Sequence, residues 1–264
     1  MGFRVLGHRG ARMVAPENTV PSFQAAIAEG ASGVELDIRR TADGALVCLH
    51  DASLGRTTNG RGPVREHTLE QIRRLDAGFW FAANGGAPYR GVRVGVPTLT
   101  EALDALPRAA MVDVEVKFRA VDDGGPLGAA ELLAETLAGR PDRDRIVVSS
   151  FSRKLVAAAV PLLDGVRVGL VTSALVPLGR AVRAAEACGC SALAAQAAAY
   201  FGPMARAACA RALDAGLLLL AWTVDEPDTA RRLADLGVEV VVADRPGPLA
   251  AALGISARDP EPPR

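Results

Sequence analysis

Strand-like and helix-like segments alternate along almost the whole chain, and this alternation is the strongest constraint on its fold. Each apolar run is followed by a stretch of helical pattern, and several of these stretches end at a glycine, such as Gly30, Gly216 and Gly237. Eight strands, each followed by a helix, predict an α/β chain folded as a (β/α)8 TIM barrel rather than an open doubly wound sheet. The expected strands cover residues 3–8, 33–39, 111–117, 145–150, 166–171, 192–196, 217–224 and 238–243.

The connection between the second and third of these strands is long enough to be an insertion. A turn at Ala42-Asp-Gly44 leads into a short returning strand at residues 45–50, and residues 51–97 are rich in Gly, Thr, Asn and Arg. Within this insertion, Gly78-Phe-Trp-Phe81 is expected to form a small core of its own. The length of 264 residues suits one large domain, so we expect a single barrel over residues 1–254 and a disordered tail at 255–264.

The second expected strand carries two acidic residues on one face. Side chains alternate along a strand, so the aliphatic residues at 34, 36 and 38 share one face while Glu35 and Asp37 share the other. Two carboxylates at this spacing on a buried strand repel each other, and each costs several kcal/mol to desolvate without a partner. A cation or a shift in protonation would relieve this cost, and we infer a bound metal.

The strand expected at residues 111–117 repeats this design. Its valines alternate with Asp113, Glu115 and Lys117, so a further acid points inward and the two strands predict one central cavity. Lys117 is one of two lysines in a chain with 30 lysine and arginine residues, which indicates that a compact ammonium is needed there. Carboxylates without a thiolate form a hard oxygen site, which favours Mg²⁺ or Ca²⁺ over Zn²⁺.

Two of the chain's three histidines, His8 and His50, stand at expected strand ends beside the proposed metal. In a (β/α)8 barrel the chemistry lies at the carboxyl ends of the strands. A lone histidine is more often a satisfied core residue, but two of them among clustered titratable groups favour general acid and base roles. His67 lies in the insertion, and we interpret it as structural or surface.

Three other polar or aromatic residues each have two interpretations. Arg9 could pair with a nearby acid such as Glu17, or it could direct its guanidinium at a phosphate. Asn18 could belong to the site or simply cap the first helix. Trp222 could be ordinary packing, or it could form a wall of the substrate pocket at the barrel rim.

Composition excludes several classes of partner. Thirty basic residues balance 30 acidic ones without a basic block, so neither nucleic acid nor an anionic membrane is expected to bind. The chain enters an apolar strand without a hydrophobic leader and lacks 18-residue apolar segments, so we expect a cytoplasmic protein without stable membrane insertion. The cysteines lack zinc-finger spacing and are expected to be reduced; they are Cys48, Cys188, Cys190 and Cys209.

Several short motifs follow one another along successive expected strands. They are His8-Arg-Gly10, Pro16-Glu-Asn-Thr19, Glu35-Leu-Asp37, Asp43-Gly44, His50-Asp51, Leu54-Gly-Arg-Thr-Thr58, Glu115-Val-Lys117 and Trp222-Thr-Val224. Together, and in this order, they resemble the glycerophosphodiester phosphodiesterase family over nearly the whole chain. The resemblance implies a (β/α)8 barrel with an insertion after the second strand.

The resemblance also implies an activity and a role for each site residue. Such enzymes hydrolyse glycerophosphodiesters, which are small molecules, to glycerol 3-phosphate and an alcohol, with a cyclic phosphate as the expected intermediate. By position, Glu35, Asp37 and Glu115 would hold a divalent metal, Mg²⁺ or Ca²⁺. His8 and His50 would be the acid and base pair, Arg9 and Lys117 would grip the phosphate, and Trp222 would contact the substrate. Departures from the family pattern at Ala42, Asp225 and residues 243–246 concern substrate preference.

Two alternatives stay open at this point. The same barrel and acid pair would also resemble phospholipase C-like or sphingomyelinase D-like enzymes, although the Pro16-Glu-Asn-Thr19 and Glu115-Val-Lys117 motifs favour the diesterase. The chain could instead be a non-catalytic barrel that binds metal and phosphate. The presence of both His8 and His50 argues against that interpretation. The sequence leaves open the head group and the oligomeric state.

Overall fold

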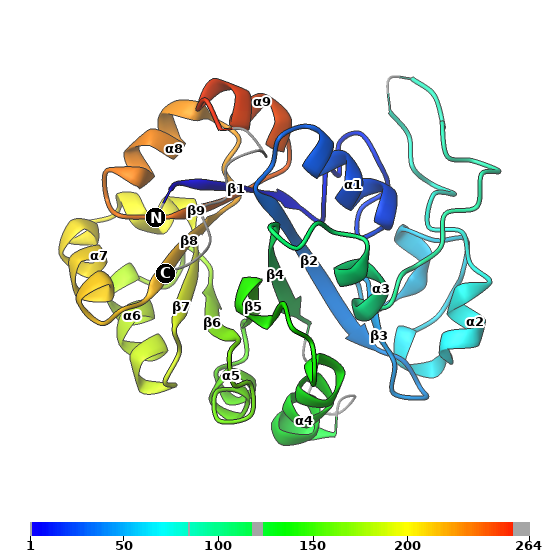
Figure 1. The fold of residues 1–264 in the computed structure, drawn as a ribbon, viewed down its shortest axis with the longest axis horizontal. Coiled ribbons are helices and arrows are strands. Elements are labelled where there is room, and N and C mark those ends of the chain that lie inside the picture. The colour runs from blue at the N-terminus through cyan, green and yellow to red at the C-terminus, as the bar shows by residue number, and fades with distance from the viewer. Residues whose placement is uncertain (1, 84, 118–123, 256–264) are drawn as a thin grey trace.

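The computed structural model describes residues 2–83, 85–117 and 124–255 of the chain. Within these residues, eight parallel strands close into a barrel surrounded by helices (Figure 1). Strand β1 pairs with both β2 and β9, which closes the ring and confirms the predicted (β/α)8 barrel. The strands of the ring are β1 (Arg4–His8), β2 (Gly33–Arg40), β4 (Met111–Val116), β5 (Ile146–Ser150), β6 (Arg167–Thr172), β7 (Ala192–Gln196), β8 (Leu218–Trp222) and β9 (Val240–Ala243).

The register of β2 against β4 aligns the acidic residues of the two strands. Glu35 lies opposite Asp113, and Asp37 lies opposite Glu115. The alternate residues of both strands pack outward against the helices, so these acids face the barrel interior. The close approach begins at Gly33, where a Cβ atom would collide with the carbonyl oxygen of Met111.

Most helices were expected from the sequence, and local capping explains where they begin. Thr19, rather than Asn18, caps the first helix by accepting a hydrogen bond from the backbone of Ser22, so the capping interpretation of Asn18 was wrong. Helix α2, in the insertion, was not expected, and α9 is the helix expected after the eighth strand of the ring. The helices are α1 (Val20–Ala28), α2 (Leu69–Arg73), α3 (Leu99–Asp104), α4 (Gly125–Leu137), α5 (Arg153–Ala159), α6 (Leu178–Ala187), α7 (Ala205–Asp214), α8 (Pro227–Ala234) and α9 (Pro246–Ala252).

The core has two layers, as a closed barrel requires. A larger layer packs the outward strand residues against the helices, and Phe23 of α1 is fully buried in it. A smaller layer fills the barrel interior with residues such as Leu6, Val147 and Leu220. The polar groups of the strands therefore lie above a packed apolar floor, at the carboxyl ends.

The segment after β2 forms a separate lobe beside the barrel (Figure 1). Strand β3 (Leu46–Cys48) returns antiparallel to β2 and is shorter than predicted, and the 3-10 helices η1 (Leu54–Arg56) and η2 (Val64–Glu66) follow. The predicted aromatic core of this insertion is wrong, since Trp80 is 54% exposed. Its core is aliphatic instead: Val47, Leu49, Leu54, Val64, Ile72, Ala77 and Val96.

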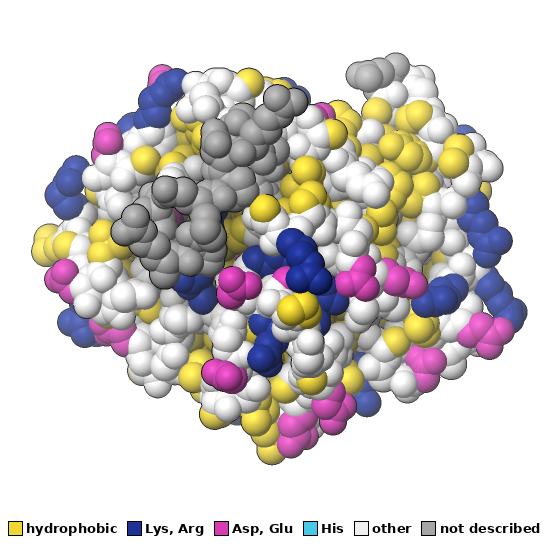
Figure 2. All heavy atoms as spheres, viewed as in Figure 1, with side chains coloured by type: hydrophobic (Ala, Val, Ile, Leu, Met, Phe, Trp, Pro, Cys, Tyr) yellow, Lys and Arg dark blue, Asp and Glu magenta, His cyan; other side chains and the backbone are white. Residues whose placement is uncertain are grey.

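The surface carries charged side chains of both signs. On the face shown in Figure 2, basic and acidic side chains are interspersed, as expected for a chain with 30 of each. Among the described residues, none of the helices is long and apolar enough to cross a membrane. Of the predicted tail, Ile255 donates a main-chain hydrogen bond to Ala250, and residues 256–264 lie outside the described residues.

Candidate functional site

Most of the site residues predicted from the sequence lie at the carboxyl ends of the barrel strands, and His50 lies just after β3. His8 is the last residue of β1, Trp222 is the last residue of β8, and Lys117 follows β4 directly. Glu35 and Asp37 lie within β2, which extends further toward this rim than its neighbours. The chain therefore folds so that residues far apart in sequence share one end of the barrel.

Three carboxylates meet at the centre of this rim. Glu35, Asp37 and Glu115 each present an oxygen, and these oxygens lie within 4.8 Å of one another. Burial, together with the charges of Asp37 and Glu115, raises the pKa of Glu35 well above its usual value. Such crowding of acids is stable only if positive charge compensates it.

Lys117 and Arg9 supply part of that positive charge. The Lys117 ammonium lies 2.9 Å from Asp37 Oδ1 and 2.5 Å from Glu115 Oε1. Arg9 Nε lies 3.1 Å from Asp37 Oδ2, and the Arg9 backbone N–H donates to Glu35. Burial alone would raise the pKa of Asp37, but Lys117 and Arg9 hold that pKa below its usual value. The sequence interpretation that paired Arg9 with Glu17 is also confirmed, with 2.9 Å between Arg9 Nη1 and Glu17 Oε1.

The side-chain amide of Asn18 holds Asp37 through both its nitrogen and its oxygen. The Asn18 amide nitrogen donates to Asp37 Oδ2 at 2.8 Å, and Asn18 Oδ1 accepts from the Asp37 backbone N–H at 3.0 Å. Asn18 adopts a left-handed φ of 57°, which a short polar residue tolerates better than a bulky one. Asn18 thus belongs to the site.

His8 is held by an acid from the far end of the chain. Its Nδ1 lies 2.6 Å from Asp244 Oδ1, and its Nε2 lies 3.9 Å from Glu35 Oε2. An ionised carboxylate can only accept, so Nδ1 carries the proton and Nε2 faces the acid cluster. Asp244 was not among the predicted site residues, although its position directly after β9, at the same rim, could have indicated it.

His50 has the same arrangement with its sequence neighbour. Its Nδ1 lies 2.7 Å from Asp51 Oδ1, so Nδ1 again carries the proton. Burial lowers the pKa of His50, which keeps the ring neutral near neutral pH. Arg39, also missed by sequence reasoning, donates to the carbonyl oxygen of His50 at 2.8 Å through Nε and to that of Lys117 at 3.3 Å through Nη1.

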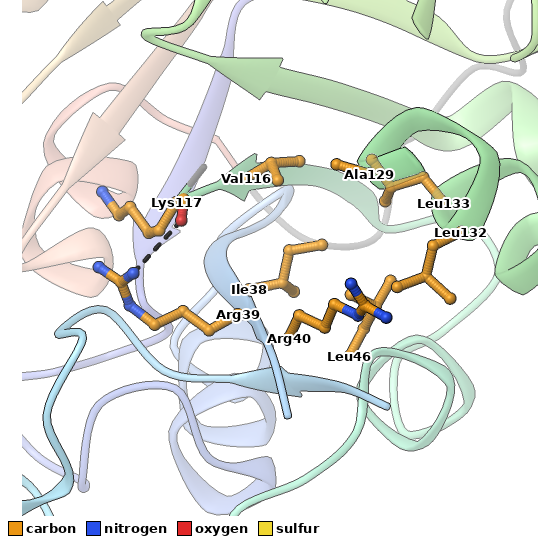
Figure 3. Close-up of a pocket in the computed structure, with 9 residues that line it drawn as sticks. All are labelled: Ile38, Arg39, Arg40, Leu46, Val116, Lys117, Ala129, Leu132 and Leu133. Carbon is orange, nitrogen blue, oxygen red and sulfur yellow. Dashed lines mark hydrogen bonds between the residues drawn. The ribbon is translucent and has the colours of Figure 1, made fainter. Parts of the chain in front are cut away.

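A separate pocket lies on the other face of β2 and β4 (Figure 3). Figure 3 shows Arg39 and Lys117 with their charged groups on one side, while Arg40 points toward Leu132 and Leu133. This pocket is narrow, and its walls combine aliphatic side chains with the stems of Arg39, Arg40 and Lys117. Lys117 borders both this pocket and the acid cluster, whereas strand alternation places the acids themselves on the opposite face of the two strands.

The rim at the ends of β6 and β7 differs in charge from the rim that bears the acids. Residues 173–177, which follow β6, and residues 197–204, which follow β7, include no charged residue. The ring of Trp222 makes an edge-to-face contact with Phe151, with 5.8 Å between centroids. Its indole nitrogen donates to the carbonyl oxygen of Ala194 at 3.3 Å. Trp222 thus lies at the rim with its indole held in place.

The donor set of the acid cluster fits a hard divalent cation. The three groups offer carboxylate oxygens, the ligand type that Mg²⁺ and Ca²⁺ prefer. When all three carboxylates are ionised, the two cations Lys117 and Arg9 leave a net negative charge in a buried place. A divalent cation would offset that excess.

The chain matches known proteins over nearly its full length. Residues 8–248 match the model of the glycerophosphoryl diester phosphodiesterase family. A glycerophosphodiester phosphodiesterase of Caldanaerobacter subterraneus is 32% identical over 247 residues, which cover 92% of this chain and 94% of that protein.

Solved structures agree with this match. A phosphodiesterase of Oleispira antarctica, in complex with the product sn-glycerol-3-phosphate, superposes with a TM-score of 0.78 at 28% identity and covers 95% of this chain and 96% of its own. A glycerophosphodiester phosphodiesterase of Agrobacterium tumefaciens has a TM-score of 0.74 at 28% identity, with 95% and 100% covered. With its barrel, its rim of acids and histidines and these similarities, the chain belongs to the glycerophosphoryl diester phosphodiesterase family.

Proposed function

We propose that this protein hydrolyses glycerophosphodiesters to glycerol 3-phosphate and an alcohol. The observation that carries the proposal is the meeting of three carboxylates, two cationic side chains and an aspartate-held histidine at one barrel rim. Family membership supports it, as does the product bound by the Oleispira antarctica phosphodiesterase. We further propose a cytoplasmic location.

Glu35, Asp37 and Glu115 are the residues that would hold a divalent metal, Mg²⁺ or Ca²⁺. When bound, the metal supplies Lewis-acid stabilisation of the charge that develops on the phosphoryl oxygens. Arg9 and Lys117 border the same carboxylates and would bind the phosphate. A guanidinium and an ammonium placed beforehand stabilise that charge without reorganisation at the moment of reaction.

His8 and His50 would carry the protons. In each ring Nδ1 donates to an aspartate, so the unprotonated Nε2 can accept a proton from the attacking hydroxyl or, once protonated, return one to the leaving alcohol. The aspartates keep each ring in the tautomer that the reaction needs. Trp222, in contact with Phe151, would form the wall on the uncharged side of the substrate.

The nucleophile is proposed to be the substrate's own hydroxyl. A glycerophosphodiester carries a free hydroxyl next to the ester carbon, and an intramolecular attack gains about 7 to 11 kcal/mol from proximity in well-oriented cases. The attack would form a five-membered cyclic phosphate and release the head-group alcohol. Water would then open the ring, with the histidines exchanging roles.

The proposal is tested with a panel of glycerophosphodiesters in the presence of Mg²⁺ or Ca²⁺, with release of glycerol 3-phosphate as the measurement. Glycerophosphocholine and glycerophosphoethanolamine are the first substrates to compare. Absence of turnover across the panel would refute the proposed activity. Cosedimentation with anionic liposomes would instead favour a phospholipase-like enzyme.

The cyclic route has its own test. An analogue that lacks the hydroxyl next to the ester should bind about as well as the parent diester and react far more slowly. Phosphorus NMR should detect a transient cyclic phosphate during turnover of the parent. Equal kcat for the analogue, with one solvent oxygen-18 incorporated in a single step, would establish direct attack by water.

A further inference from the structure

One arginine of the insertion links the two sides of the proposed site. Arg56, at the end of η1, lies between the carboxylates of Asp51 and Glu17 and pairs with both. Its Nε and Nη2 donate to Asp51 at 2.6 and 3.2 Å, and its Nη1 and Nη2 donate to Glu17 at 2.9 and 2.7 Å. Every nitrogen of the guanidinium is therefore engaged.

Each carboxylate that Arg56 contacts also holds a residue proposed for the reaction. Asp51 Oδ1 accepts from Nδ1 of His50, and Glu17 Oε1 accepts from Nη1 of Arg9. A continuous series of hydrogen bonds and ion pairs thus runs from the proton-transfer residue His50 to the phosphate-binding residue Arg9. Arg56 is the middle of that series.

The backbone around Arg9 shows that its direction is closely determined. Arg9 adopts a left-handed φ of 55°, and its carbonyl oxygen accepts hydrogen bonds from the hydroxyl of Ser22 and the backbone of Asn18. Glu17 then fixes the end of the side chain. Since Glu17 is itself paired bidentately with Arg56, the insertion contributes to where the Arg9 guanidinium lies.

We propose that Arg56 is a positioning residue. Through Asp51 and Glu17, it orients His50 and Arg9 relative to each other for the reaction. This inference rests on the proposed function. Arg56 would thus connect the insertion, which forms the lobe beside the barrel, to the residues of the proposed site. This role requires the planar guanidinium of an arginine, which has donors on two edges. The single ammonium of a lysine cannot form bidentate pairs with two carboxylates.

An ordinary surface ion pair would behave differently, and the chain offers one for comparison. Arg211 of α7 pairs bidentately with Glu186 of α6, away from the barrel rim, and its side chain is 56% exposed against 44% for Arg56. Exposed pairs of this kind contribute little to stability. The variant Arg211→Ala is therefore the matched control for Arg56→Ala.

The kinetic test separates the two branches of the series. Arg56→Ala should lower kcat and raise KM, with kcat/KM reduced by about 10- to 100-fold, as for partners that orient reacting groups. Asp51→Asn should act mainly on kcat through His50, and Glu17→Gln mainly on KM through Arg9. Combining Arg56→Ala with either should give a smaller loss than the product of the separate losses. Arg56→Lys should recover only part of the activity, and Arg211→Ala should match the wild type.

Chemical rescue distinguishes positioning from folding. Because Arg56 is partly exposed, millimolar guanidinium should enter the space left in Arg56→Ala and restore part of kcat. The same concentration of sodium chloride should not. The thermal midpoint of Arg56→Ala should stay close to that of Arg211→Ala, since both remove an exposed arginine.

A measurement without substrate keeps the proposal separate from the activity. With three histidines in the chain, ring ¹⁵N and ¹H NMR signals can be assigned from single variants. The hydrogen-bonded Nδ1–H of His50 should broaden or shift in Arg56→Ala, whereas that of His8 should not. If the wild type turns over no diester, the proposed function fails, and this spectrum still decides the role of Arg56. Unchanged His50 signals, or wild-type kcat and KM in Arg56→Ala, would overturn the proposal.

Discussion

Asp244 Oδ1 lies 2.6 Å from Nδ1 of His8, although 236 residues separate them in the sequence. This contact fixes which ring nitrogen of His8 bears the proton. Asp244→Asn should therefore lower kcat by about 10²-fold or more, because an amide can also donate and stabilise the wrong tautomer. Steady-state kinetics on a glycerophosphodiester would measure the change. Asp228→Asn, an exposed acid of α8 that pairs with Arg231, should leave kcat unchanged. Equal kcat in Asp244→Asn and the wild type would show that the contact has no part in proton transfer.

The histidines give a second prediction with an internal control. His8→Ala and His50→Ala should each reduce kcat by about 10²-fold or more, the usual effect of removing a positioned acid or base. His67, whose Nδ1 contacts the carbonyl oxygen of Pro63 in the insertion, should be replaceable by Ala without loss of kcat. Circular dichroism would verify that each variant folds. If either His8→Ala or His50→Ala retained wild-type kcat, its proposed role would be refuted.

Metal dependence gives a third prediction. Chelation with EDTA should abolish turnover, and Mg²⁺ or Ca²⁺ should restore it. The near-isosteric variants Glu35→Gln, Asp37→Asn and Glu115→Gln should each weaken metal binding in calorimetric titrations, because each removes one charged oxygen ligand. Glu186→Gln, which changes a surface acid, should titrate as the wild type does. Full activity in EDTA would contradict the metal proposal.

Asp142 and Arg145 give a prediction about stability and pH. Burial alone would raise the pKa of Asp142, but hydrogen bonds from Arg140 and Arg145 lower it to about 2, from 3.8. A carboxyl with a lowered pKa stabilises the folded state above its unfolded pKa, and this stabilisation is lost as pH falls from about 4 to about 2. The free energy of unfolding of the wild type should therefore exceed that of Asp142→Asn by about 2 kcal/mol at neutral pH. Screening of the ion pair by solvent reduces this difference.

Urea unfolding at a series of pH values would measure this difference. The difference in unfolding free energy between the two proteins should shrink below pH 4. A difference that is constant from pH 7 to pH 2.5 would mean that the ion pair does not lower the pKa of Asp142.

The barrel and the position of the acids could be predicted because they follow from local patterns. Alternation within β2 and β4 places Glu35, Asp37 and Glu115 on the inward face whatever the rest of the chain does. The rule that parallel strands end at one rim then brings Lys117 to the same place. The face and the rim position of these residues do not depend on which helices pack against which strands.

Partners that depend on tertiary contacts could not be predicted in the same way. Asp244 reaches His8 only because β9 pairs with β1, and Asn18 reaches Asp37 only through the conformation of the loop before α1. The aliphatic core of the insertion was missed because the aromatic cluster near Trp80 gave the stronger local signal. Helix α2, with five residues, is too short to show a clear period.

The seam between the first and last strands has a consequence for assembly. Gly7 lies opposite Ala243, so His8 receives its Asp244 partner only when the two ends of the sheet meet. The pairing that closes the ring therefore also orients His8, which is proposed to transfer protons. An incompletely closed barrel would hold the acid cluster of β2 and β4 but leave the His8 ring unoriented. Recovery of diester turnover during refolding would therefore report ring closure, while recovery of metal binding would report the pairing of β2 with β4.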